Sequence, residues 1–135
     1  MITISEKSRS AVLALTELAQ RGTTNPVPIL EIAEARAIPL HFLEQLFAGL
    51  RRAGILQSQR GVKGGYSFRR PPTQVTVLDV VEIVDGQLAA NDERPTGEDI
   101  WEEARASLCQ VLAGVTVADI VEREARASTA PMFFI

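Results

Sequence analysis

Cysteine and histidine are almost absent from this sequence, which has one of each, Cys109 and His41. A single cysteine forms no internal disulfide and builds no Cys-based metal framework. With only one histidine besides, the chain has too few ligands for a typical zinc site and too few residues for a hydrolytic triad. We therefore expect a protein that is not an enzyme and holds no metal. Cys109 stands between Leu108 and Val111 in an apolar helical pattern, which favours packing over a redox role.

Long apolar runs are missing as well. No run approaches the ~20 residues that a membrane helix needs, and the N-terminal stretch MITISEKSRS lacks the apolar core of a signal peptide. We expect a soluble, cytoplasmic protein without a membrane partner. At 135 residues and 46% apolar, the chain can bury one good core, with a second helical layer formed through dimerisation.

Carboxylates are absent from one long stretch, Gln45 to Leu78, although the whole chain carries a net charge of −3. The same stretch contains six cations, which are Arg51, Arg52, Arg60, Lys63, Arg69 and Arg70. Residues 1–75 hold ten Lys and Arg against five Glu, whereas residues 76–135 hold four Arg against twelve Asp and Glu. Clustered cations of this kind are the electrostatic footprint of a nucleic-acid partner.

Two short helical patterns meet at a corner within residues 29–52. Apolar residues recur at one-face positions in both patterns, and they are Ile29, Ile32, Ala33, Ile38, Leu43, Leu46, Phe47 and Leu50. Pro39 disfavours helix at the residue before it, so the first helix ends near Ala37 and the second begins at Pro39. A connection of about three or four residues makes the helices cross sharply, as in a helix-turn-helix. Ala37 stands where many such turns have a glycine.

The second helix presents a polar stripe opposite its apolar face, formed by His41, Glu44, Gln45, Ala48 and Arg52. Gln can bond adenine through two atoms, Glu can accept from the cytosine amino group, and His can donate to guanine or to a phosphate. A merely solvated helix face is the alternative. The basic stretch that follows in the chain favours DNA recognition.

A basic, glycine-rich hairpin comes next. Gly54 ends the helix, Ile55–Gln59 and Tyr66–Arg69 alternate in strand fashion, and the loop RGVKGG lies between them. Its glycines permit positive φ and a close approach to a phosphate backbone or the floor of a minor groove. A nucleotide-binding P-loop is not indicated, because the run lacks GxxxxGK followed by Ser or Thr and opens no helix. The residues expected to contact DNA are His41, Glu44, Gln45, Arg51, Arg52, Arg60, Gly61, Lys63, Gly64 and Gly65.

Three fragments of this region, taken in combination, resemble the Rrf2 family of bacterial winged-helix transcription regulators, which includes iron-sulfur cluster and nitric oxide sensing repressors. The fragments are LEQL at Leu43–Leu46, LRRAGI at Leu50–Ile55, and Arg60-Gly61 with Gly64-Gly65-Tyr66. The similarity extends over most of the range from Met1 to about Val121. It implies that Glu44 and Gln45 belong to the reading helix and that Arg60 and Gly61 form the wing contact. Family members often have a small hydroxyl residue in place of His41 and usually a tyrosine in place of Ser10.

The resemblance also bears on cofactors. Cluster-binding members of the family carry three cysteines between the fourth helix and the long dimer helix, and the matching segment here, Asp85–Asp99, has none. Carboxylates such as Asp92 and Glu93 suit hard cations and do not build a thiolate-held cluster. We therefore expect no iron-sulfur cluster and no other cofactor.

Pro71-Pro72 makes a stiff break after the hairpin. We place a DNA-binding domain at residues 1–72, a helical dimerisation and regulatory region at residues 73–128, and an apolar C-terminal tail at residues 129–135. The tail could insert into a pocket of a protein partner, carboxylate first. Alternatively, it folds onto its own dimer or frays.

One phrase occurs twice beyond this break. VTVLDVVE at Val75–Glu82 recurs as VTVADIVE at Val115–Glu122. In each copy a threonine is expected to cap a helix, and an aspartate three residues later to accept from the exposed N–H groups. We interpret the two copies as one helix-start solution used twice and not as an internal repeat.

The helical pattern from Glu98 to Ala113 has more apolar width than one monomer needs. Its apolar residues are Ile100, Trp101, Ala104, Leu108, Val111 and Leu112. We expect this helix to pack against its twin across a two-fold axis, which would bring two reading helices to a pseudo-palindromic site. A plain intramolecular helix is the alternative.

The expected fold is mainly α with a small β-wing, a winged helix-turn-helix domain followed by C-terminal dimerisation helices. The expected function is sequence-specific binding of double-stranded DNA by a homodimer that regulates transcription, as a repressor more than as an activator. The alternative is a winged-helix adaptor that binds a metabolic enzyme or another partner and reads no DNA. A salt titration against random duplex separates the two.

Overall fold

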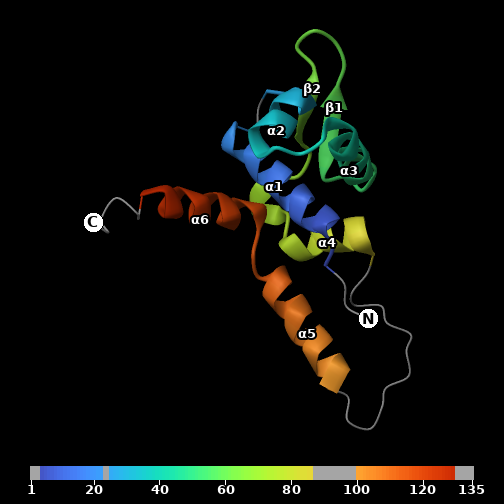
Figure 1. Cartoon of the computed structure of the whole chain (residues 1–135), viewed down its shortest axis with the longest axis vertical. Helices are drawn as coiled ribbons and strands as arrows, with labels where there is room; N and C mark the ends of the chain where they lie inside the picture. The colour runs from blue at the N-terminus through green and yellow to red at the C-terminus, as the bar shows by residue number, and fades with distance from the viewer. Residues whose placement is uncertain (1–3, 23–24, 87–99, 130–135) are drawn as a thin grey trace.

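A computed structural model describes residues 4–22, 25–86 and 100–129. In chain order (Figure 1) the elements are α1 (Glu6–Gln20), α2 (Ile29–Arg36), α3 (Leu40–Arg52), β1 (Leu56–Gln59), β2 (Gly65–Phe68), a short 3₁₀ turn η1 (Pro72–Gln74), α4 (Val77–Asp85), α5 (Ile100–Ala113) and α6 (Val117–Thr129). The prediction of a mainly helical fold with a small β-wing is confirmed. Within these ranges, no helix is both long enough and apolar enough to cross a membrane.

α1 lies at the centre of the molecule, with α2, α3 and the hairpin on one side and α4 and α6 on the other (Figure 1). Ser5 caps its start, because Ser5 Oγ accepts a hydrogen bond from Lys7 N at 3.1 Å. Side chains that are almost fully buried include Ala11, Leu15, Leu18, Ile32, Leu43, Phe47, Leu50, Ile55, Val75, Val80 and Val117. The core is therefore continuous from α1 to the start of α6, across the predicted domain boundary at residue 72.

The corner between α2 and α3 has the predicted geometry. α2 ends at Ala37, which adopts the left-handed conformation with φ +55° and ψ +44°. Ile38 N then donates to Ala33 O at 2.9 Å, and Pro39 precedes the first residue of α3. This tight connection is what turns α3 outward as the second helix of a helix-turn-helix.

The two copies of the repeated phrase start α4 and α6, and these starts lie side by side. At each one the threonine and the aspartate hydrogen-bond to each other's backbone N–H, at 3.0 Å for Thr76 with Asp79 and at 2.9 and 3.1 Å for Thr116 with Asp119. The predicted caps are confirmed. Thr76 and Thr116 also form an antiparallel bridge, in which Val117 N donates to Val75 O at 2.8 Å. The bridge returns α6 to the core.

The end of α4 holds the start of α1 through a carboxylate. Asp85 accepts hydrogen bonds from Ser5 N at 3.0 Å, from Ser5 Oγ at 2.6 Å and from Ser8 Oγ at 2.5 Å. Burial opposes ionisation of Asp85, but these hydrogen bonds outweigh it, so the pKa of this carboxyl lies below its ordinary value. The charge also meets the positive end of the α1 dipole. α1 and α4 are therefore fixed to each other at this end.

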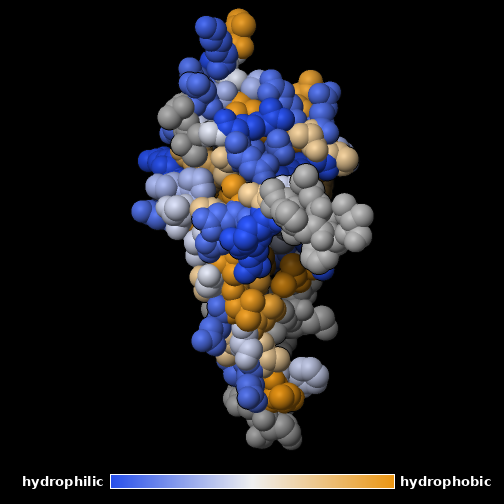
Figure 2. All heavy atoms as spheres, turned by 90° about the vertical axis from the view of Figure 1, so that its left-hand side faces the viewer, coloured by the Kyte–Doolittle hydropathy of each residue, from blue (hydrophilic) through white to orange (hydrophobic). Residues whose placement is uncertain are grey.

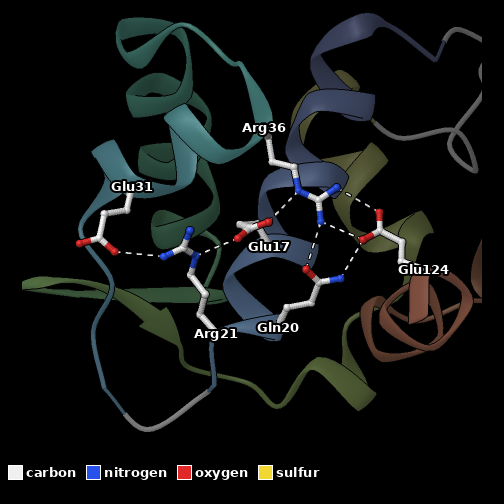
Figure 3. Close-up of polar contacts among 6 residues, drawn as sticks. All are labelled: Glu17, Gln20, Arg21, Glu31, Arg36 and Glu124. Atoms are coloured by element: carbon white, nitrogen blue, oxygen red, sulfur yellow. Dashed lines mark hydrogen bonds and ion pairs between the residues drawn. The ribbon is translucent and has the colours of Figure 1, made fainter. Parts of the chain in front are cut away.

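Arg36, the last residue of α2, connects three helices (Figure 3). Its Nε donates to Glu17 of α1 at 2.9 Å, and its Nη1 and Nη2 donate to Glu124 of α6 at 3.0 and 2.9 Å. Gln20 of α1 also donates to Glu124, at 2.7 Å. The hydrogen bonds from Arg36 hold the pKa of Glu124 below its ordinary value. The cluster fixes the first helix of the helix-turn-helix to both α1 and α6.

α5 stands apart from this core. It extends away from the rest of the molecule (Figure 1), and none of its side chains is buried. The predicted start at Glu98 and the apolar tail at residues 129–135 lie outside the described residues, apart from the backbone of Thr129 at the end of α6. An exposed apolar helix of this kind calls for a partner surface.

Candidate nucleic-acid interface

The polar stripe of α3 is exposed, as the sequence predicts. Leu43, Phe47 and Leu50 bury one face of the helix completely. On the other face the His41 side chain is 85% exposed and that of Glu44 is 53% exposed. Gln45 and Arg52 are also exposed, whereas Ala48 is half-buried and lies at the edge of the stripe. α3 therefore offers an uncovered polar ridge.

Three side chains near the start of this ridge lie against one another. Gln45 Nε2 is 3.3 Å from His41 Nε2, and His41 Nδ1 is 3.8 Å from Glu44 Oε1. They belong to the first turns of α3, the part of a recognition helix that usually faces base edges. The Gln45 amide Nε2 can only donate, so His41 Nε2 is the acceptor in this arrangement, and Oε1 of Gln45 remains available for a base donor.

The cations that follow are exposed and mostly unpaired. Among the described residues, none of Arg51, Arg52, Arg60, Lys63 and Arg69 forms an ion pair, and Arg70 is 3.7 Å from Asp79. Elsewhere arginines are neutralised by carboxylates, as Arg21 is by Glu17 at 2.8 Å. The difference follows from the stretch without carboxylates between Gln45 and Leu78. The unpaired guanidinium and ammonium groups are free to bind phosphates.

The hairpin β1–β2 forms the predicted wing. Its strands pair antiparallel from Leu56 opposite Phe68 to Gln59 opposite Gly65. The ring of Tyr66 packs edge-on against Phe47 of α3, with 5.0 Å between ring centroids. This contact packs the wing against α3.

Val27 extends the wing sheet in a way that the sequence did not predict. Val27 N donates to Tyr66 O and Tyr66 N donates to Val27 O, both at 2.9 Å. The only sequence signal is the pattern Pro26-Val27-Pro28, which favours extended backbone before a proline. Next to it, a surface hollow is lined by Asn25, Pro26, Pro28, Gln59, Lys63 and Gly64. Asn25 and Gln59 thus lie beside Lys63 in this hollow, and no sequence pattern predicted either of them as a site residue.

The reason for a glycine differs among the three wing positions 61, 64 and 65. A Cβ at Gly64 would lie 2.2 Å from Gln59 O, and a Cβ at Gly65 would lie 2.3 Å from Val27 O, so both are required by contacts within the protein. Gly61 has φ +110° and open space around it. The sequence predicted positive φ and a close approach of DNA for these glycines, and the positive φ is confirmed at Gly61 and Gly65. The structure supplies an internal cause for Gly64 and Gly65, and their DNA contact stays a prediction.

The residues predicted for dimerisation form an exposed apolar stripe on α5. Ile100 is 52% exposed, Trp101 77% and Val111 64%. Ala104 is exposed too, whereas Leu108 and Leu112 are half-buried. Figure 2 shows hydrophobic residues gathered on the lower half of the molecule, where Figure 1 places α5. Within the described chain, Ile100, Trp101, Ala104 and Val111 of this stripe stay uncovered.

The combination of helix-turn-helix, basic wing and extended C-terminal helices recurs in known regulators. The Rrf2 family model, described as "Iron-dependent Transcriptional regulator", matches residues 4–123. The chain belongs to the Rrf2 family. It is 31% identical over 136 residues to the HTH-type transcriptional regulator CymR of Bacillus subtilis, covering 98% of this chain and 99% of CymR. It is 30% identical over 131 residues to the regulator IscR of Klebsiella pneumoniae, covering 90% of this chain and 80% of IscR.

Solved structures of Rrf2 proteins share the fold. The structure of CymR, the global cysteine regulator of B. subtilis, matches with a TM-score of 0.81 over 91% of this chain and 98% of that one. The structure of T. potens IscR matches with a TM-score of 0.82 and 32% identity, over 96% of this chain and 93% of the other. The protein is thus a DNA-binding transcriptional regulator with a winged helix-turn-helix, and not an enzyme.

The iron in the family description raises the question of whether this Rrf2 protein has the ligands for a cluster. A thiolate-held cluster takes several cysteines, and the chain has only Cys109, on α5. In the ranges that the structure describes, no three His, Cys, Asp or Glu side chains are grouped so that they could hold a metal ion. The donor set of this chain does not fit a cysteine-ligated cluster.

Proposed function

We propose that this Rrf2 regulator binds double-stranded DNA in a sequence-specific manner and represses transcription. α3 lies in the major groove, where His41, Glu44 and Gln45 meet base edges, and the wing lies on the backbone or in the minor groove. The unpaired cations between Gln45 and Leu78 carry this proposal, because a cluster of exposed arginines without carboxylates is best stabilised by phosphates. The cytoplasmic location predicted from the sequence follows, since bacterial DNA lies there.

We also propose that the active form is a homodimer. Its interface is the apolar stripe of α5 defined by Ile100, Trp101, Ala104, Leu108, Val111 and Leu112. The occupant is a second copy, because an identical stripe supplies the complementary apolar surface across a two-fold axis. Two reading helices would then face half-sites about one turn of DNA apart.

Selection of bound fragments from genomic DNA, followed by a salt titration on the selected duplex, tests the DNA-binding proposal. If each subunit makes about six phosphate contacts, the logarithm of affinity falls by roughly 0.9 per contact for each tenfold rise in salt. A selected duplex should bind at least about a thousandfold more tightly than random duplex. Failure to bind any duplex would favour the adaptor alternative.

We propose that the protein works without an iron-sulfur cluster. The donor set supports this, because one thiol cannot replace the ligands of a cluster. The signal would then reach the regulator by another route, for which the C-terminal residues 132–135 are our candidate contact with a protein partner. Anaerobic purification should give a protein without visible absorption. Deletion of residues 132–135 should abolish partner capture and leave DNA binding intact.

A further inference from the structure

The most exposed large apolar side chain among the described residues belongs to the tip of the wing. Val62 is 102% exposed, more than Trp101 at 77%. Figure 2 shows a hydrophobic group at the top of the molecule beside strongly hydrophilic ones, where Figure 1 places the wing. Transfer of an isopropyl group out of water is favourable, so any partner that covers Val62 lowers the free energy of the complex.

The base of the wing holds Val62 in this position. Gly64 N donates to Gly61 O at 3.0 Å and closes the turn, while the glycine at 64 packs directly on Gln59. Below the turn, the hydrogen bonds between Val27 and Tyr66 anchor β2. Val62 is therefore displayed by a braced hairpin and does not fold back onto the protein.

The neighbours of Val62 define the chemistry of the partner. Arg60 and Lys63 flank the tip, and neither has a carboxylate partner among the described residues. A matching surface is anionic at its edges and apolar between them. The walls of the minor groove of duplex DNA have this pattern, because phosphates line the rims and deoxyribose C–H groups form the walls, while base acceptors lie on the floor.

We propose that Val62 enters the minor groove beside the site of α3 and makes the wing sensitive to the base pairs there. This inference rests on the DNA-binding function proposed above. In a G·C pair the guanine amino group projects from the groove floor, whereas A·T pairs have none. The valine side chain has no acceptor for that amino group and needs its space. The wing therefore selects A·T pairs beneath Val62, through shape and without a hydrogen bond.

Operators with A·T, G·C or inosine·C pairs beneath the wing test the proposal by fluorescence anisotropy. Inosine·C has the major-groove edge of G·C but lacks the amino group in the minor groove. Wild type should bind the A·T and inosine·C operators about equally and the G·C operator about fivefold more weakly. Val62→Ala should lose about fivefold in affinity for the A·T operator and most of the discrimination. Its salt dependence should be unchanged, because no phosphate contact is lost.

Arg60→Ala is the matched control on the same turn. It should weaken binding to all three duplexes equally and lower the salt slope by about one contact. If Val62→Ala binds every duplex like wild type, or weakens all three equally, the valine does not enter the groove and the inference fails while the DNA-binding function stands. If wild type binds no duplex, the proposed function fails, and this inference with it.

Discussion

Ala37 holds a backbone conformation in which glycine is less strained. Its φ of +55° costs an alanine about 1–2 kcal/mol relative to the right-handed region. Ala37→Gly removes that strain but adds freedom to the unfolded chain, so we expect the free energy of unfolding to rise by about 0.5–1 kcal/mol. Urea unfolding followed by circular dichroism measures it.

Ala35→Gly provides the control for this prediction. Ala35 is exposed like Ala37 but lies inside α2 with helical backbone. There glycine should lower the free energy of unfolding by about 1 kcal/mol. If both substitutions change the free energy of unfolding in the same direction, the left-handed conformation of Ala37 is not strained.

Substitution of Gln45 should change the preferred DNA sequence at a single base pair of each half-site. A bidentate contact to a base discriminates by about 1–3 kcal/mol. Gln45→Ala should relax preference at one base pair per half-site and leave the salt slope as it is. Competition between operator variants measures this. Gln57→Ala, an exposed glutamine on β1, is the control and should leave preference unchanged. Uniform weakening on every sequence would contradict base recognition by Gln45.

At the residue scale, the sequence predicts what depends on near neighbours. The caps at Thr76 and Thr116 can be predicted because each needs only an aspartate three residues later. The reason for Gly65 could not be predicted, since it depends on contact with Val27, which lies far away in the sequence. The exposed stripe of α3 is an intermediate case, because helical periodicity determines it once the helix is correctly bounded.

At the scale of elements, α6 is attached to the DNA-binding part through Glu124. The substitution Glu124→Gln removes the charge of this carboxylate and weakens two hydrogen bonds from Arg36. Because both side chains are partly exposed, at 34% and 16%, we expect a loss of only about 1 kcal/mol in unfolding free energy at neutral pH. Equilibrium unfolding in urea measures it.

The pH dependence of that loss identifies its cause. The pKa of Glu124 is lowered in the folded state, so its contribution is complete above the ordinary carboxyl pKa and disappears as the pH falls through the folded value. Wild type and Glu124→Gln should therefore become equally stable in acid. Glu122→Gln is the control on the same helix, since Glu122 lies 3.9 Å from Arg126 and both are about 70% exposed. A loss that persists unchanged in acid would rule out the ion pair.

The starts of α4 and α6 can be predicted from the sequence, but their association cannot. Both helices and their starting residues follow from the repeated phrase, which is a local pattern. The bridge between Thr76 and Thr116 joins positions forty residues apart and depends on the path of the chain between them. Nothing in either copy alone indicates that the two would pair.

At the scale of the whole molecule, the division of charge is visible from the sequence because counting charges needs no coordinates. Coordinates are needed to tell which cations lack a carboxylate partner. Arg70 lies near Asp79, just beyond the carboxylate-free stretch, whereas Arg69 next to it has no such partner among the described residues. The sequence likewise placed a boundary near Pro72. That boundary stays a prediction, and Val75 and Val117 beyond it belong to the same core cluster as residues of α1 and α3.

The proposed assembly of two chains is the property on which we expect operator binding to depend most. A charge within the α5 stripe should prevent it, since an unpaired carboxylate buried between two apolar helices costs several kcal/mol. Trp101→Glu should sediment as a monomer and bind the operator at least about a hundredfold more weakly, because one reading helix then replaces two. Ala106→Glu places the same charge on the opposite, exposed face of α5 and should remain dimeric. If Trp101→Glu still forms dimers with full affinity, the two-fold contact lies on another surface.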